Sequence, residues 1–153
     1  KSKPEDVARI LSYQKAKSIS EKKKYFNYNV IGCDTLIKLG DRIFDKAKNN
    51  KEALLKIKKL SGKKHKIISS LTICNQGSKI WECSETTVVE IRKLTTKQIE
   101  GYLKKSGKQI LQSVGCYQLE ALGPQIIKDI KGDFFNVMGL PLFKLLKYVF
   151  DEQ

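Results

Sequence analysis

An acid and a lysine in one short stretch, Asp34 and Lys46, have the types and spacing that suit a metal-bound phosphate. Asp34 follows residues 30–33, a short apolar run of the kind that a buried strand shows. A carboxylate at the end of a buried strand is costly unless it meets water, a metal or a donor, so we expect Asp34 to face a cleft. The chain then turns at Gly40 and Asp41 and presents Lys46 just before a helix. A surface hairpin with ordinary charges is the alternative that spacing alone leaves open.

A second lysine with chemical potential is Lys15, in a helix that we expect over residues 4–21. Val7, Ile10 and Leu11 share one face of that helix at helical spacing, and Lys15 lies beside them, four residues past Leu11. A lysine in this position can bury its stem and bring its ammonium group to the edge of a cleft. Snorkelling over apolar surface, without any binding role, explains the same position.

Six segments of the chain also form an ordered series. They are VIGCDT at 30–35, IFDKAKNNKEA at 43–53, LSGKKH at 60–65, ETTVVEI at 85–91, GCYQLEALG at 115–123 and GDFFNVMGLPL at 132–142. In this order they resemble the Maf family of nucleoside triphosphate pyrophosphatases, in which a strand ending in Asp-Thr precedes a Lys-Pro and then Leu-Ser-Gly-x-x-His. The series covers nearly the whole chain and is more specific than any one motif.

The resemblance implies an enzyme, a hydrolase that cleaves a nucleoside triphosphate between the α- and β-phosphates and releases pyrophosphate. It also implies a divalent cation, Mg²⁺ or Mn²⁺, that neutralises the polyphosphate. Asp34 would hold that metal or take the proton of the attacking water. Lys15, followed by Ala16 as in the family's Lys-Ala pair, and Lys46 would offset the charge of the phosphates. The resemblance ties Thr35 to substrate choice.

Glu120 is the residue from which the resemblance implies a base preference. It ends the segment 114–120, where family members carry either glutamine or glutamate and differ in the base they prefer. A glutamine can meet a thymine or uracil edge because it both donates and accepts, whereas a carboxylate only accepts. The carboxylate suits the paired N–H donors of guanine and a cationic base such as 7-methylguanine. We therefore expect 7-methyl-GTP to be preferred over dTTP and UTP; without the resemblance, a solvated loop glutamate explains Glu120 equally well.

Some family features are not in the sequence. The family's first strand and its Ser-x-Ser-Pro-Arg-Arg phosphate loop are missing from a sequence that starts at Lys1, while Ala47 and Val114 stand where proline and alanine are usual. We expect that the segment was removed or not included, or that the chain is a truncated relative with weak or no activity. Two functions follow: a house-cleaning pyrophosphatase for non-standard or methylated nucleotides, or a catalytically impaired nucleotide- or nucleic-acid-binding relative that keeps the fold.

Composition describes a protein with one core and a strongly basic surface. The 153 residues are 41% hydrophobic and 30% charged, with a net charge of +14, which is enough chain for one domain spanning 1–153. The basic residues are 27 Lys against 3 Arg, whereas base readers and phosphate forks favour arginine. We therefore expect solvated lysine faces, a nucleoside triphosphate as the substrate, and no specific nucleic acid as partner.

The four cysteines contain no C-x-x-C pair, so neither a zinc knuckle nor a dense disulfide framework is indicated. No apolar run has the length of a membrane span, and no signal peptide is visible. We expect a cytoplasmic protein without membrane association that forms a homodimer.

Alternating helix and strand patterns predict an α/β fold. The expected elements are helices at 4–21, 50–60 and 95–105, strands at 65–74, 79–92 and 125–131, and a last helix from Pro141. Asn75-Gln76-Gly77-Ser78 predicts a hairpin, and His65, with no second histidine near it, is interpreted as structural. The predicted architecture is a single domain with a mixed, hairpin-rich sheet flanked by helices, similar to the Maf and inosine-triphosphatase-like fold with its long cleft.

Overall fold

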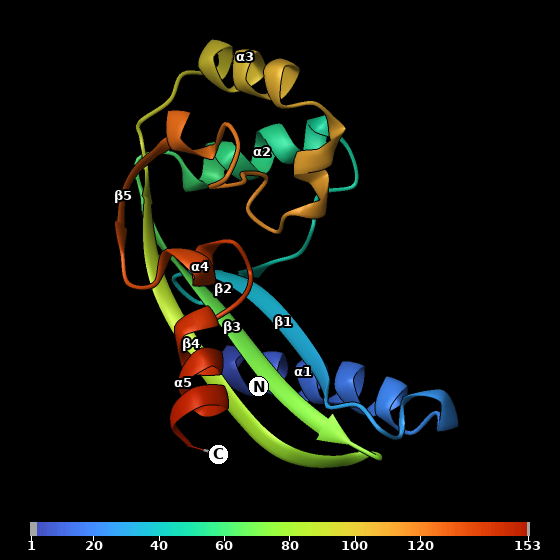
Figure 1. Ribbon diagram of the computed structural model, residues 1–153. Coiled ribbons are helices and arrows are strands. Elements are labelled where there is room, and N and C mark those ends of the chain that lie inside the picture. The colour runs from blue at the N-terminus through green and yellow to red at the C-terminus, as the bar shows by residue number, and fades with distance from the viewer. Residues whose placement is uncertain (1–2, 153) are drawn as a thin grey trace. The chain divides into compact units, whose positions relative to one another are not determined.

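The computed structural model describes residues 3–152, which form five α-helices and one five-stranded sheet (Figure 1). The helices are α1 (Pro4–Ser20), α2 (Asn50–Leu60), α3 (Thr96–Ser106), α4 (Phe134–Val137) and α5 (Leu142–Asp151). The strands are β1 (Val30–Leu39), β2 (Arg42–Phe44), β3 (Lys64–Asn75), β4 (Ser78–Ile91) and β5 (Ile127–Lys131), in the sheet order β2-β1-β3-β4-β5. The predicted α/β class, with its hairpins and flanking helices, is confirmed.

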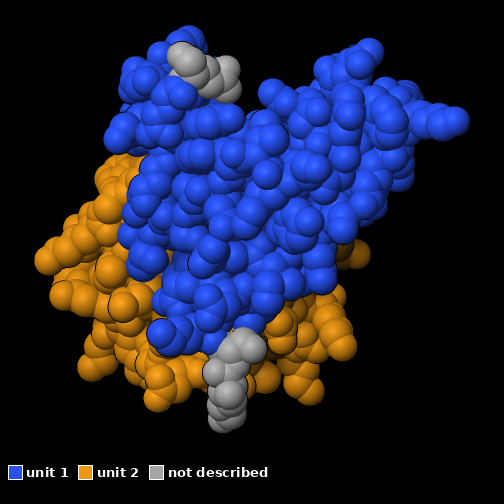
Figure 2. Space-filling model, turned by 90° about the horizontal axis from the view of Figure 1, so that it is seen from below, with its two compact units in different colours: residues 1–35, 68–86, 135–153 blue, residues 36–67, 87–134 orange. Residues whose placement is uncertain are grey.

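The chain divides into two compact units (Figure 2). Unit 1 comprises residues 1–35, 68–86 and 135–153, and unit 2 comprises residues 36–67 and 87–134. A single domain over 1–153 therefore stays a prediction. Among the residues described, no helix combines the length and the hydrophobicity that crossing a bilayer requires.

The hairpins follow from turn residues with positive φ. Gln76 (φ 49°) and Gly77 (φ 80°) connect β3 to β4, and this left-handed backbone matches the twist of a two-residue hairpin. Gly40 (φ 58°) connects β1 to β2, which pair antiparallel with Ile37 opposite Phe44. Both hairpins were predicted from the sequence.

The helix ends also follow local signals. At the start of α2 the Asn49 side chain accepts a hydrogen bond from the backbone N–H of Glu52. At the start of α3 Thr95 and Gln98 form a complete capping box, and Gly107 ends that helix. These two predicted boundaries are confirmed.

In unit 1, α1 packs through small residues, and the predicted apolar stripe is wrong. Ile10 is 52% exposed, and Leu11 is exposed as well. The fully buried positions recur every four residues: Ala8, Ser12, Ala16 and Ser20. Two of them, Ser12 and Ala16, face Gly32 of β1, where an added Cβ would lie only 2.2 Å from the backbone oxygen of Ser12. The helix approaches the strand so closely that only small side chains fit between them, which leaves the larger ones outside.

The last helix, α5, covers the opposite face of the same part of the sheet. Its Leu145 packs on Leu71 and Ile73 of β3. Between them Thr72 points the other way, and its hydroxyl lies 2.9 Å from that of Ser12 on α1. Since successive side chains of a strand alternate between faces, α1 and α5 lie on opposite sides of β3. On the same helix Leu146 and Val149 are exposed.

In unit 2, α2 packs against α3, and the His65 side chain is buried. The ring Nε2 of His65 lies 2.6 Å from the hydroxyl of Tyr117, and burial lowers the pKa of His65 to about 4. A neutral, hydrogen-bonded ring fits the structural role predicted for it.

Candidate active site

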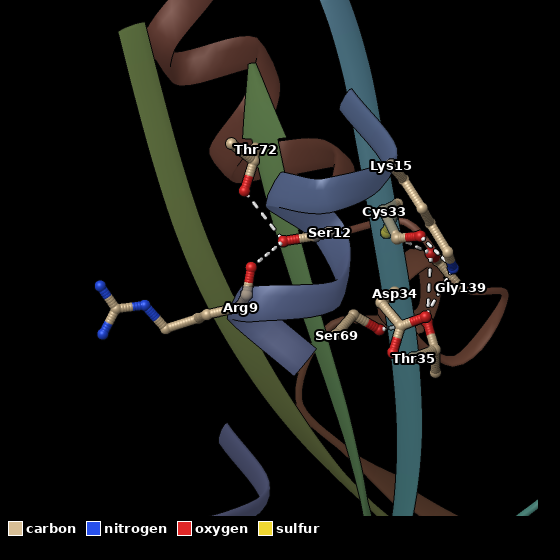
Figure 3. Close-up of polar contacts among 9 residues, drawn as sticks. All are labelled: Arg9, Ser12, Lys15, Cys33, Asp34, Thr35, Ser69, Thr72 and Gly139. Atoms are coloured by element: carbon tan, nitrogen blue, oxygen red, sulfur yellow. Dashed lines mark hydrogen bonds and ion pairs between the residues drawn. The ribbon is translucent and has the colours of Figure 1, made fainter. Parts of the chain in front are cut away.

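Asp34 is the fifth residue of the ten-residue strand β1, not the end of a strand as predicted. The strand continues because Leu36 to Leu39 lead directly into the β1–β2 hairpin. Alternation along β1 places Asp34 on the face of Gly32, toward α1. There its Oδ1 accepts a hydrogen bond of 2.5 Å from Lys15 Nζ, which also donates to the backbone oxygen of Cys33 at 3.0 Å (Figure 3).

The two partners of this ion pair differ in exposure. The side chain of Asp34 is 12% exposed, whereas that of Lys15 is 56% exposed. Lys15 reaches β1 from the outer surface of α1, one residue before the buried Ala16. The carboxylate is therefore the enclosed partner of the pair, and the ammonium group is the partner open to solvent.

The second carboxylate oxygen of Asp34, Oδ2, is buried and has no hydrogen-bond partner within the described residues. A buried charged oxygen without a donor is costly, so this atom suits a water molecule, a cation or a ligand proton. Between residues 3 and 152 no cluster of three or more His, Cys, Asp or Glu side chains could hold a metal ion. A cation at Oδ2 would need water and phosphate oxygens as further ligands, an arrangement typical of Mg²⁺.

Thr35 points to the face opposite Asp34. Its hydroxyl lies 2.9 Å from that of Ser69 and 3.4 Å from the backbone oxygen of Gly139 (Figure 3). The thiol of Cys33 donates to the same Gly139 oxygen, and burial raises the pKa of Cys33 to about 11, so the thiol stays protonated. Ser69 and Gly139 could not be predicted from the sequence, because they are 34 and 104 positions from Thr35 and only the tertiary structure brings them against it.

The other two predicted site residues belong to unit 2. Lys46 is exposed in the loop between β2 and α2, where it lines a cavity of about 280 Å³ with Arg42, Lys56 and Lys59. Glu120 is exposed in the turn that precedes Gly123. The structure thus joins Lys15 to Asp34 in unit 1 and places Lys46 and Glu120 in unit 2.

A family model described as Maf-like protein matches residues 1–151. The chain belongs to the Maf family. It is 40% identical over 143 residues to the 7-methyl-GTP pyrophosphatase of Brucella suis biovar 1 (strain 1330), a match that covers 94% of this chain and 71% of that protein. It is 32% identical over 152 residues to the nucleoside triphosphate pyrophosphatase of Bradyrhizobium diazoefficiens, with 99% of this chain and 74% of that protein covered.

Membership of the Maf family confirms the resemblance inferred from the ordered motifs. The roles assigned to Asp34, Lys15, Lys46, Thr35 and Glu120 stay predictions, as does the divalent metal.

Proposed function

We propose that this Maf protein is a nucleoside triphosphate pyrophosphatase that hydrolyses the bond between the α- and β-phosphates and prefers 7-methyl-GTP to dTTP and UTP. Family membership supports the reaction class, and the relatives' names support both the reaction and the base. The observation that carries the proposal is the buried Oδ2 of Asp34, which has no hydrogen-bond partner in residues 3–152 and lies beside the ammonium group of Lys15.

A bound divalent cation would neutralise the polyphosphate and bring its oxygens together. Asp34 would hold that ion through Oδ2 or accept a proton from the attacking water, because both tasks need a carboxylate oxygen free of other donors. Lys15 keeps the carboxylate oriented through Oδ1 until substrate arrives. Since Lys15 is half exposed, its ammonium group can turn toward an incoming phosphate at small cost.

In unit 2, Lys46 would supply a second cation for the phosphates, and Glu120 would accept hydrogen bonds from the base. Both side chains are exposed and therefore free to meet a ligand. Thr35 would influence substrate choice through its hydrogen bonds to Ser69 and Gly139, which hold β1 on the face away from Asp34.

The proposed setting is the cytoplasm, with a homodimer as the assembly. The cysteines at 33, 74, 83 and 116 are all free thiols, which fits a reducing compartment. Size-exclusion chromatography with light scattering would test the dimer, and a monomeric mass at micromolar concentration would contradict it.

The activity is tested by pyrophosphate release from a nucleotide panel, with Mg²⁺, with Mn²⁺ and with chelator. We expect metal-dependent release that is fastest with 7-methyl-GTP. The assay includes a second version of the protein that carries the family's Ser-x-Ser-Pro-Arg-Arg segment before Lys1. If neither version releases pyrophosphate from any nucleotide, the proposal fails.

A second candidate function, binding of single-stranded nucleic acid, is favoured by the charge distribution. Most of the excess of basic over acidic residues lies in unit 2. Binding carried by lysines should weaken steeply with salt. Anisotropy of a labelled single-stranded RNA at 50 and 200 mM salt tests this candidate. Tight binding at 50 mM that weakens steeply by 200 mM would support it, and no binding at 50 mM would contradict it.

A further inference from the structure

Lys56 is a buried lysine in the middle of α2. Its relative exposure is 8%, whereas Lys58 and Lys59 on the same helix are exposed. Lysine is almost never buried without partners, because desolvating the ammonium group is costly. Here burial lowers the pKa of Lys56, and the partners are backbone oxygens from two other segments.

Those two oxygens belong to segments that carry predicted site residues. Lys56 Nζ donates to the carbonyl oxygen of Asp45, the residue before Lys46. It also donates, at 3.0 Å, to the carbonyl oxygen of Val114, which opens the segment ending in Glu120. A single ammonium group therefore ties together the loop of Lys46 and the segment of Glu120, all within unit 2.

Cys116, in the segment of Glu120, is also influenced by the backbone amide of Ala47, the residue after Lys46. The thiol of Cys116 is fully buried, and burial raises its pKa against the opposing influence of Lys56 and of the Ala47 backbone amide. Cys116 also has a positive φ of 56°, which a residue of its kind adopts only when its surroundings hold it there. The backbone around residue 116 is thus held against the loop of Lys46.

Packing alone does not require a lysine at this position. The neighbouring inward positions of α2 are Ala53, Ile57 and Leu60, and a methionine at 56 would fill similar volume without desolvating a charge. What methionine would lack is the pair of hydrogen bonds to Asp45 and Val114. The hydrogen bonds of the ammonium group, and not the packing of the aliphatic chain, therefore account for a lysine at position 56.

We propose that Lys56 is a positioning residue that sets the phosphate-binding loop of Lys46 and the base-selecting segment of Glu120 in one fixed relation. The roles of those two residues rest on the proposed function, whereas the link made by Lys56 does not. Loss of the ammonium group should release both segments together, so phosphate binding and base selection should weaken in one step.

The link is tested without substrate by hydrogen–deuterium exchange of the protein and its Lys56→Met variant, with Lys58→Met as the exposed control on the same helix. We expect faster exchange in peptides covering 44–49 and 113–118 for Lys56→Met alone. Unchanged exchange in both peptides would overturn the inference. If Lys56→Met does not fold, Lys56→Arg is measured in its place. This variant keeps a charged donor, so both peptides should be protected from exchange nearly as well as in the original protein.

The positioning role is tested by steady-state kinetics with 7-methyl-GTP and dTTP, well below the unfolding temperature of each variant. We expect kcat/KM for 7-methyl-GTP to fall on the order of 10–100-fold in Lys56→Met, with a smaller preference over dTTP and recovery in Lys56→Arg. An unchanged preference in an active, loosened variant would reduce Lys56 to a structural residue. If the original protein is inactive, the proposed function fails, while coupled loosening of both peptides would still support the link.

Discussion

Asp34 and Lys15 form an ion pair in which the lysine is the more exposed partner. Because Lys15 is more than half exposed, the pair contributes at most about 1 kcal/mol to stability. The buried Oδ2 of Asp34 has no hydrogen-bond partner among the described residues, so a donor or cation bound there would offset the loss of Lys15 from Oδ1. An ion pair this weak suits a binding site, because a ligand can replace Lys15 as the partner of Asp34 at small cost.

Replacement of Asp34 by asparagine should abolish turnover while the fold is kept, because the shape remains and the charge for metal or water is lost. The measurement is pyrophosphate release from 7-methyl-GTP, with circular dichroism to check folding. Asp41→Asn, an exposed carboxylate in the β1–β2 turn, is the control and should keep full activity. Activity of Asp34→Asn within a few-fold of the original would contradict its assignment.

Lys15→Ala and Lys46→Ala should each lower kcat/KM on the order of 100-fold, the usual cost of losing one donor to developing charge in an enclosed site. Lys22→Ala and Lys63→Ala, both exposed, should have little effect. The comparison uses the same nucleotide and metal for all four variants. Equal kinetics across the four would mean that these lysines only carry surface charge.

Glu120→Gln should narrow the preference for 7-methyl-GTP over dTTP, because an amide can pair with either edge and no longer attracts a cationic base. Glu120 is exposed in the free protein, and a bound base would cover it. An acceptor that is covered in this way and faces the carbonyl oxygens of a pyrimidine costs roughly 1–3 kcal/mol, or about 5- to 150-fold in selectivity. Competition between the two nucleotides measures the ratio for both proteins. A ratio that does not change would show that Glu120 does not contact the base.

At the scale of elements, the position of the Lys15 side chain depends on how closely α1 approaches β1. The approach requires Gly32, since an added Cβ would meet the Ser12 oxygen at 2.2 Å and the Ala16 nitrogen at 2.6 Å. Both of these atoms are backbone and cannot move without displacing the helix. The position of the Lys15 ammonium group therefore depends on a residue with no side chain.

Gly32→Ala should destabilise the protein by about 1–3 kcal/mol or more, as overpacking of a tight contact does, and should weaken catalysis through the displaced Lys15. Gly101→Ala is the matched control: it lies inside α3 with no atom within 4 Å of an added Cβ, so it should stabilise by up to about 1 kcal/mol. Denaturant unfolding of both variants measures whether each substitution lowers or raises the free energy of unfolding. A stable, fully active Gly32→Ala would contradict the close approach of α1.

At the scale of the whole molecule, one buried histidine should make stability depend on pH. The pKa of His65 is lowered from 6.5 to about 4 by burial, so between these values the unfolded chain binds a proton that the folded chain does not. The stabilisation is therefore complete above pH 6.5 and is lost as the pH falls toward 4.

The measurement is the free energy of unfolding at pH 7.5 and 4.5 for the protein and for His65→Gln, which cannot titrate. The free energy of unfolding of the original protein minus that of His65→Gln should be about 2–3 kcal/mol smaller at pH 4.5 than at pH 7.5. Taking the difference removes the titration of the carboxylates that both proteins share. If this difference in free energy is equal at both pH values, His65 does not take up a proton when the protein unfolds.

Local features of the chain could be predicted from the sequence because a few consecutive residues determine them. Gln76-Gly77 specifies a hairpin through its positive φ angles, and Thr95 with Gln98 specifies a helix start through reciprocal hydrogen bonds. The ordered motifs were also sufficient for the Maf family, since they depend only on residue order.

Other features were decided only by the tertiary structure, because they depend on residues far apart in the chain. Periodicity favoured Leu11 as the inner face of α1, but the contact with Gly32 made Ser12 and Ala16 the inner residues instead. No local pattern distinguishes Lys56 from the exposed lysines around it, since its burial arises when the backbone of Val114 comes within 3.0 Å of its ammonium group. Sequence separation is the physical reason: propensity acts over a few residues, whereas packing joins segments whose proximity exists only after folding.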